Sequence, residues 1–370
     1  MCLHLPTKEE RIRRLPVRWL STAAQSEILA QRVLDSDHHS IALAGSGESV
    51  GRFGQLALLQ VATQDEIFLL DVQSGGSEML SCWAPVLSST SLVKVLHDCR
   101  DLVSLLLNVH HLPIYSVFDL QVAYSAWLER ENLEVYQAAL AEVLRKFSLA
   151  YQMHRWDQLE RHGETNVTER PLQPMALRRA VELVAHLLPL QGTLNKELGD
   201  LSGTLVQRRS LPYVDYAKMN LKLQELHSGA KLEAMLASTK PHMAYFKLNH
   251  RMMGVVPEED LKEFMDLKPG DVAQCEVKSI SPCQRFAYLQ REGHGNLWFD
   301  RHQHRMLKLP DLDDRPQRQS SLYGVAQGAP PLREERRSFR EPKAQVVHKL
   351  GKRGAVKVKK TGFTPPPQRR

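Results

Sequence analysis

The chain has 370 residues, of which 42% are hydrophobic, so it can bury one large core or two modest ones. No segment approaches the roughly 18 consecutive apolar residues that a membrane-spanning helix needs, and the first residues lack the apolar stretch of a secretory signal. The five cysteines are scattered and odd in number, which is typical of a reducing compartment, and none has the spacing of a zinc site. We therefore expect neither a membrane association nor a cofactor.

The net charge of +7 is unevenly distributed along the chain. Residues 301–370 contain 18 Lys and Arg against 6 Asp and Glu, whereas residues 1–300 contain 31 against 36. A basic segment of this kind typically binds polyanions. Because the same segment is rich in Pro and Gln and poor in large apolar side chains, we expect a disordered basic tail over residues 301–370.

Strands and helices alternate over the first half of the chain. Arg18–Asp37 predicts the start of a strand and then a helix capped by Ser21 or Thr22. The next predicted elements are strands at Ile41–Leu43, Leu56–Ala62 and Ile67–Val72, a strand and helix within Leu92–Val109, and helices at Val135–Phe147 and Met175–Leu188. This order favours an α/β domain with a mixed sheet.

The pattern changes in the second half. Thr193–Ser238 has helical spacing, which Pro212 is expected to interrupt, and Lys240–Glu292 has a Pro-Gly-Asp turn followed by alternating apolar residues. The latter predicts a small β module, either a plain hairpin or a small nucleic-acid-binding barrel. The predicted domains are an N-terminal extension (1–17), an α/β domain (18–200), a helical extension (201–239), a β module (240–300) and the basic tail (301–370).

Four segments of the α/β domain carry a resemblance to a known family. "GQLALLQVAT", "KVLHDCR", "VFDLQVA" and "RPL…LLPL" occur in the order and spacing of the ribonuclease D-like DEDD 3′–5′ exonuclease superfamily, over about residues 18–200. The resemblance implies a ribonuclease H-like fold, a mixed sheet flanked by helices. Within the superfamily the chain is most similar to the exonuclease 3′–5′ domain-containing protein 1 family. That similarity implies a germline and meiotic role in the Piwi-interacting RNA pathway, in the cytoplasm or perinuclear germ granules, with a homodimer and a Tudor-domain partner.

Active members of the superfamily hold two divalent metal ions with four carboxylates and cleave phosphodiester bonds. The resemblance places the first motif, Asp-x-Glu, on Ala44 and Ser46, and the second-motif Asp on Leu102. The Tyr-x-x-x-Asp of the third motif falls on Arg179 and Leu183. All five positions are changed, so the resemblance implies a protein that has lost both the metal and the catalysis.

Nearby acidic residues have other expected roles. Asp98 is predicted to cap a helix, and the resemblance gives Asp119 a supporting role. A rival hypothesis is a divergent exonuclease that uses Glu48, Asp101 and Glu182 as displaced metal ligands.

Three functions thus remain open from sequence: an inactive adaptor that binds single-stranded RNA, the divergent exonuclease, and a protein-binding scaffold without RNA affinity. The candidate RNA-binding residues are Arg179 and, in the tail, Lys349, Lys352, Arg353, Lys357, Lys359 and Lys360.

Overall fold

The computed structural model describes residues 15–147, 166–199 and 202–292. Almost all of the predicted N-terminal extension and the whole basic tail, with its six candidate RNA-binding residues, lie outside these ranges. Within them no helix is long and apolar enough to cross a membrane.

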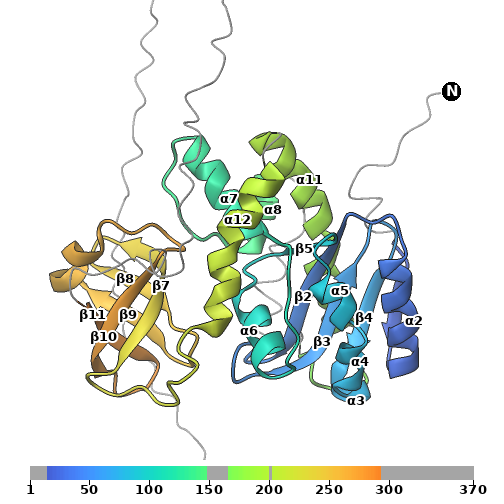
Figure 1. Ribbon diagram of the computed structural model, residues 1–370, viewed down its shortest axis with the longest axis horizontal. Coiled ribbons are helices and arrows are strands. Elements are labelled where there is room, and N and C mark those ends of the chain that lie inside the picture. The colour runs from blue at the N-terminus through green and yellow to red at the C-terminus, as the bar shows by residue number, and fades with distance from the viewer. Residues whose placement is uncertain (1–14, 148–165, 200–201, 293–370) are drawn as a thin grey trace, which may run out of the picture. The chain divides into compact units, whose positions relative to one another are not determined.

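A six-stranded mixed sheet forms the centre of the first domain (Figure 1). Its strands, in spatial order, are β1 (Val17–Leu20), β4 (Ile67–Asp71), β3 (Gln55–Ala62), β2 (Ser40–Glu48), β5 (Val93–Leu96) and β6 (Val117–Asp119). The β4–β3 and β3–β2 pairs are antiparallel and the other three pairs are parallel. Strands β3 and β4 are buried along nearly their whole length, as expected for the centre of a sheet covered on both faces. The predicted α/β class and mixed sheet are confirmed.

Helices connect and cover these strands. They are α2 (Ala23–Leu34), α3 (Val72–Gly75), α4 (Glu78–Ser81), α5 (Ala84–Ser88), α6 (Arg100–Asn108), α7 (Leu120–Arg130), α8 (Leu140–Lys146), α10 (Pro174–Ala185), α11 (Leu187–Leu198) and α12 (Ser202–Asp215), followed by the 3₁₀ turn η2 (Tyr216–Lys218). Of the two predicted caps of α2, Thr22 is the one used, because its hydroxyl accepts a hydrogen bond from the Gln25 amide. Helix α10 packs across β2, β3 and β4, so it brings the third-motif positions to the sheet.

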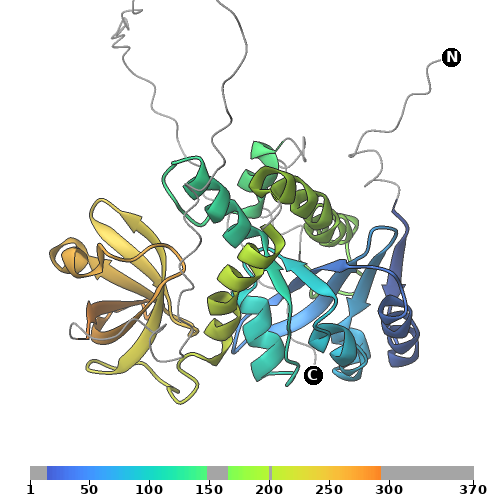
Figure 2. The same ribbon diagram turned by 45° about the horizontal axis from the view of Figure 1, so that its top comes forward.

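A closed five-stranded barrel follows (Figure 2). It consists of β7 (Lys231–Lys240), β8 (Met243–Lys247), β9 (Met253–Pro257), β10 (Val272–Ile280) and β11 (Phe286–Arg291), with the 3₁₀ helix η3 (Glu258–Phe264) between β9 and β10. The barrel has its own core, in which Phe246 packs edge-on against Phe264. Gly254 is required inside it, because a β-carbon there would come within 2.5 Å of Leu289 Cδ1.

Two sequence predictions about this half are wrong. The helical extension does not reach residue 239, because α12 ends at Asp215 and η2 at Lys218. Gly229, with a positive φ of 83°, then turns the chain into β7, which begins at Lys231. The alternation of Leu232, Ala234 and Leu236, all buried, is that of a strand. Pro212 does not interrupt α12, which continues for three more residues.

The helix predicted for Val135–Phe147 is also shorter than expected, since α8 begins only at Leu140. The preceding segment is irregular, and there Gln137 reaches into the domain to bind Arg100.

Candidate active site

The strand that carries the first motif is neutral at both ligand positions. Ala44 and Ser46 lie on β2, both half-buried, and Ala44 is paired across the sheet with Gln60 of β3. Gln60 is fully buried, and its Nε2 donates a hydrogen bond of 2.7 Å to Ser46 Oγ. The resemblance predicts carboxylates at these two positions; the structure has the methyl group of Ala44 and the hydroxyl of Ser46 there, with the Gln60 amide bonded to that hydroxyl.

Leu102 fills space beside the same strand. It lies in the first turn of α6, is 6% exposed and belongs to the main core. A β-carbon built on Gly45 would come within 2.6 Å of Leu102 Cδ1 and 3.1 Å of Leu56 Cδ1. The glycine between the two first-motif positions thus leaves room for the leucine, and the core extends to where a metal ligand is expected.

The two third-motif positions lie one turn apart on α10. Arg179 and Leu183 are both half-buried, on a helix that packs against β2 and β3. The structure thus joins Leu102 directly to the strand of Ala44 and Ser46, and brings the helix of Arg179 and Leu183 against it.

The three displaced acids of the rival hypothesis are not brought together. Glu48 is exposed at the end of β2, Asp101 forms an ion pair of 3.1 Å with Lys247 of the barrel, and Glu182 pairs with Arg178 at 2.7 Å one turn away on α10. Throughout the described ranges, no group of three or more His, Cys, Asp or Glu side chains is arranged to hold a metal ion. In this structure two of the three acids are thus paired with cations and the third is exposed.

Asp119 supports the fold, in line with the role that the resemblance gives it. It is fully buried at the end of β6 and accepts hydrogen bonds from the amides of Asp98 (3.1 Å), Cys99 (2.6 Å) and Gln121 (2.8 Å). The carboxylate thereby caps α7 and holds the start of α6. The prediction that Asp98 is the helix cap is wrong, because its carboxylate turns instead to Arg100.

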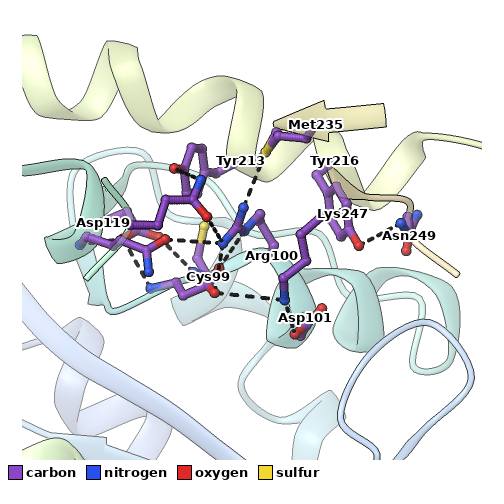
Figure 3. A network of polar contacts seen from close by, with 12 residues as sticks. Cys99, Arg100, Asp101, Asp119, Tyr213, Tyr216, Met235, Lys247 and Asn249 are labelled. Carbon is purple, nitrogen blue, oxygen red and sulfur yellow. Dashed lines mark hydrogen bonds and ion pairs between the residues drawn. The ribbon is translucent and has the colours of Figure 1, made fainter. Parts of the chain in front are cut away.

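Arg100 is the centre of a buried polar network (Figure 3). Its guanidinium makes two hydrogen bonds to Asp98, of 2.5 and 2.8 Å, and further ones to Gln121 (3.1 Å) and Gln137 (2.9 Å). It also lies 4.6 Å from the centre of the Tyr213 ring. Such a bidentate pair with its remaining donors satisfied can be held inside a protein.

The network shifts the titration of its members. Burial alone would raise the pKa of Asp98, but the charge and hydrogen bonds of Arg100 outweigh it and hold that pKa far below its usual range. Burial likewise works to lower the pKa of Arg100, and the charge of Asp98 overcomes it and raises that pKa. Both shifts favour the ionised form of the pair.

The first turns of α6 also attach the barrel to the sheet domain. Arg100 Nη1 contacts Met235 Sδ of β7 at 3.6 Å, and Ser104 Oγ donates to Asn249 Oδ1 at 2.6 Å. The backbone N–H of Asn249 donates a hydrogen bond of 2.6 Å to the Tyr216 hydroxyl. Figure 3 shows these two residues side by side. Helix α6 therefore contributes Leu102 to the candidate site, and Arg100 and Ser104 to the contact with the barrel.

Sequence reasoning missed two buried cations in this region. Arg100 and Lys94 are both less than 2% exposed, and Lys94 Nζ donates to the carbonyl oxygens of Ser89 and Leu92. Burial lowers the pKa of Lys94 to about 8. For Lys94 the available signal was a charged residue inside an otherwise apolar segment, which is uncommon without a buried partner. Arg100 lies between Asp98 and Asp101, so its neighbours gave no such signal.

Comparisons with known proteins agree on the first domain. Residues 17–199 match the model of a 3′–5′ exonuclease family. The piRNA biogenesis protein EXD1 of Mus musculus is 30% identical over 176 residues, which make up 45% of this chain and 31% of the mouse protein. The protein of the same name from Bombyx mori is 28% identical over 161 residues, or 43% of this chain and 50% of that one. The chain thus spans half or less of the length of these relatives.

Solved structures of ribonuclease D resemble the same part of the chain. RNase D of Trypanosoma brucei in complex with GMP is 21% identical, with a TM-score of 0.49, over 56% of this chain and 66% of that one. RNase D of Escherichia coli is 20% identical, with a TM-score of 0.42, over 53% and 50%. At these values the likeness concerns the fold and carries nothing about the chemistry.

Proposed function

We propose that this protein is an inactive relative of the 3′–5′ exonucleases, whose family model residues 17–199 match, and that it binds single-stranded RNA and acts as an adaptor. The observation that supports it most directly is the neutral, filled site. Ala44 and Ser46 provide no charge, and Leu102 packs on Gly45 in the place of a ligand.

Two-metal hydrolysis requires negative charge that the site lacks. Mg²⁺ gives up its water reluctantly and is bound through carboxylates in near-octahedral geometry. The nearest acids, Asp101 and Glu182, are paired with cations, and Glu48 is exposed at the end of its strand. The fold can retain RNA binding without the chemistry, because a fold does not fix the function of its site.

We extend the proposal to the Piwi-interacting RNA pathway because the curated relatives carry that name. Self-association, a Tudor-domain partner and a place in cytoplasmic germ granules belong to the same proposal. Analytical ultracentrifugation tests the first of these, and a sedimentation coefficient that stays monomeric at micromolar concentration counts against a homodimer.

The central test is RNA decay and RNA binding measured on the same preparation. The full chain is incubated with 5′-labelled single-stranded RNA and either Mg²⁺ or Mn²⁺, and products are resolved by gel alongside a filter-binding titration. We expect binding that weakens as salt rises, without shortening of the RNA. Metal-dependent shortening of the RNA would establish the divergent exonuclease. Absence of RNA binding at low salt would instead favour the hypothesis of a protein-binding scaffold without RNA affinity.

Two adjacent arginines on α10 offer a matched comparison of the former active site with the open surface. Arg178 is exposed and paired with Glu182, whereas Arg179 is half-buried on a helix that packs on the site strand. A guanidinium in that place can hold a phosphate that is no longer cut. We expect Arg179→Glu to weaken RNA binding about tenfold or more, and Arg178→Glu about twofold, the size of an ordinary surface change. If both substitutions weaken RNA binding equally and only slightly, the RNA does not contact Arg179.

A further inference from the structure

The barrel has a strand order that is itself informative. Numbered from its first strand, β7, the five strands lie in the order four, five, three, two, one, and the sheet closes between the first and the fourth. The fifth strand runs parallel to the third, and every other pair is antiparallel. This is the Greek-key arrangement of the oligonucleotide- and oligosaccharide-binding fold, which binds ligands on the outer face of its second and third strands. Because a fold does not establish a binding site, the residues on that face must show whether the barrel can bind a ligand there.

The outer face of β8, β9 and β11 carries aromatic and sulfur-containing side chains. The register sets Tyr245 of β8 beside Val255 of β9, and Val255 beside Tyr288 of β11. The neighbouring row runs from Lys247 through Met253 to Phe286. Residues that alternate with these, such as Phe246 and Leu289, fill the barrel core, so both rows point outward. Tyr288 and Met253 are each 37% exposed, and Tyr245 and Phe286 are half-buried.

The two ends of this face carry opposite charge. Arg251 lies in the β8–β9 loop and Arg285 just before β11, both exposed, and the Arg285 carbonyl accepts a hydrogen bond from the Met253 amide. Arg251 also lies over the ring of Phe53, which the turn between β2 and β3 contributes. At the far end β9 passes into the acidic first turn of η3. The face therefore pairs ring surfaces with positive charge at the end beside Met253.

The geometry points to a binding site for a short stretch of single-stranded RNA on this face. Bases stack on Tyr245 and Tyr288, and the backbone phosphates approach Arg251 and Arg285. Aromatic faces with adjacent cations are what an unpaired strand requires, because every base has a ring face and every nucleotide a charge. A peptide partner would not need the ring row and the arginines to be adjacent. This site rests on the proposed RNA binding and adds to it a contact surface on the barrel, which lies outside residues 17–199.

The rings are tested by substitution in the full chain. The variant with both Tyr245→Ala and Tyr288→Ala should bind a labelled 12-nucleotide RNA about 5- to 150-fold more weakly for each stacked base lost. The variant with Tyr245→Phe and Tyr288→Phe keeps the rings and should bind like wild type. Tyr115→Ala, which removes a 51% exposed ring from the sheet domain, is the matched control and should change nothing. Circular dichroism and melting temperature confirm that each variant is folded.

Salt dependence separates the stacking from the charge. The alanine variant should lose affinity at every salt concentration with an unchanged log–log slope, because stacking releases no counterions. The variant with Arg251→Gln and Arg285→Gln should reduce that slope by about 1.4, since each phosphate contact on a single strand contributes about 0.7. In wild type, ultraviolet crosslinks to 4-thiouridine-labelled RNA should map to peptides of β8 or β11.

The possible outcomes distinguish this inference from the function on which it rests. If wild type binds RNA and both tyrosine variants bind equally well, with crosslinks only outside residues 231–291, the barrel site is refuted while RNA binding stands. If the phenylalanine variant loses as much affinity as the alanine variant, stacking is refuted. Absence of RNA binding by wild type at low salt refutes the proposed function and this site together.

Discussion

Replacing Leu102 with aspartate tests whether the second-motif position has become part of the core. Leu102 is 6% exposed and lies against Gly45 and Leu56. Aspartate has nearly the same shape, so the change removes apolar contact without opening a large cavity. Loss of a buried leucine's transfer free energy costs about 1.5–3 kcal/mol, and an unpartnered polar group adds about 1–3 kcal/mol. We expect Leu102→Asp to lower the free energy of unfolding by about 2.5–6 kcal/mol, and the melting temperature by about 5–24 °C.

The pH dependence of this variant carries the sharper test. Burial raises the folded-state pKa of the introduced carboxyl above its unfolded value of about 3.9. Below about pH 4 the carboxyl is protonated in both states, so ionisation costs nothing. As pH rises the unfolded chain releases the proton first, and stability falls by up to about 1.4 kcal/mol per pH unit until the folded-state pKa is reached. Leu102→Asn, which is similar in shape and cannot ionise, is the control.

Urea unfolding of both variants at pH 4, 5, 6 and 7 measures the difference. The free energy of unfolding of Leu102→Asp should fall progressively below that of Leu102→Asn as pH increases. A difference that stays constant, or an aspartate variant as stable as wild type at pH 7, would show that the pocket is polar or already cationic. We also expect no nuclease turnover from Leu102→Asp, since one carboxylate does not make a two-metal site; turnover would show that other ligands are present.

Four further changes test other parts of the structure. Gly45→Ala should cost about 1–3 kcal/mol by urea unfolding, and clearly less in a Leu102→Ala background, because Leu102 Cδ1 is the atom that its β-carbon meets; additive costs would refute that explanation. Arg100→Ala should lower the free energy of unfolding by about 3–5 kcal/mol, because it removes a buried guanidinium and takes its bidentate partner from the half-buried Asp98, with Arg100→Lys intermediate; a wild-type melting curve would contradict a stabilising pair. Burial lowers the folded-state pKa of Lys94 to about 8, whereas the unfolded lysine keeps its proton to about pH 10.4. The free energy of unfolding of wild type should therefore rise from pH 8 to 10 relative to that of Lys94→Met, and parallel pH profiles would refute this. Deleting residues 311–370 should weaken RNA binding and reduce the log–log salt slope by about 0.7 per lost phosphate contact, and an unchanged slope and affinity would assign the binding to the folded body.

Several features of this protein could be predicted from its sequence because they depend on local pattern. The strands near Ile41 and Leu56 and the helix that Thr22 caps are visible as apolar periodicity and a capping residue. The identity of the residues at the five motif positions is likewise a matter of sequence, since the resemblance places them by spacing alone. What those positions do remained a hypothesis, because spacing carries no information about contacts.

The tertiary structure decided the features that depend on residues far apart in the chain. Strand β7 is paired with β10, for example through Met235 and Val272, when the barrel closes. The sequence of β7 alone does not contain this pairing, so it did not distinguish a strand from the end of a helix. The burial of Arg100 could not be read from its neighbours, since its hydrogen-bond partners include Gln121 and Gln137 on later elements. The packing of Leu102 on Gly45 joins residues 57 positions apart. Local propensity acts over a few residues, whereas burial and ion pairing are set by what the fold places alongside, and only the three-dimensional arrangement contains that information.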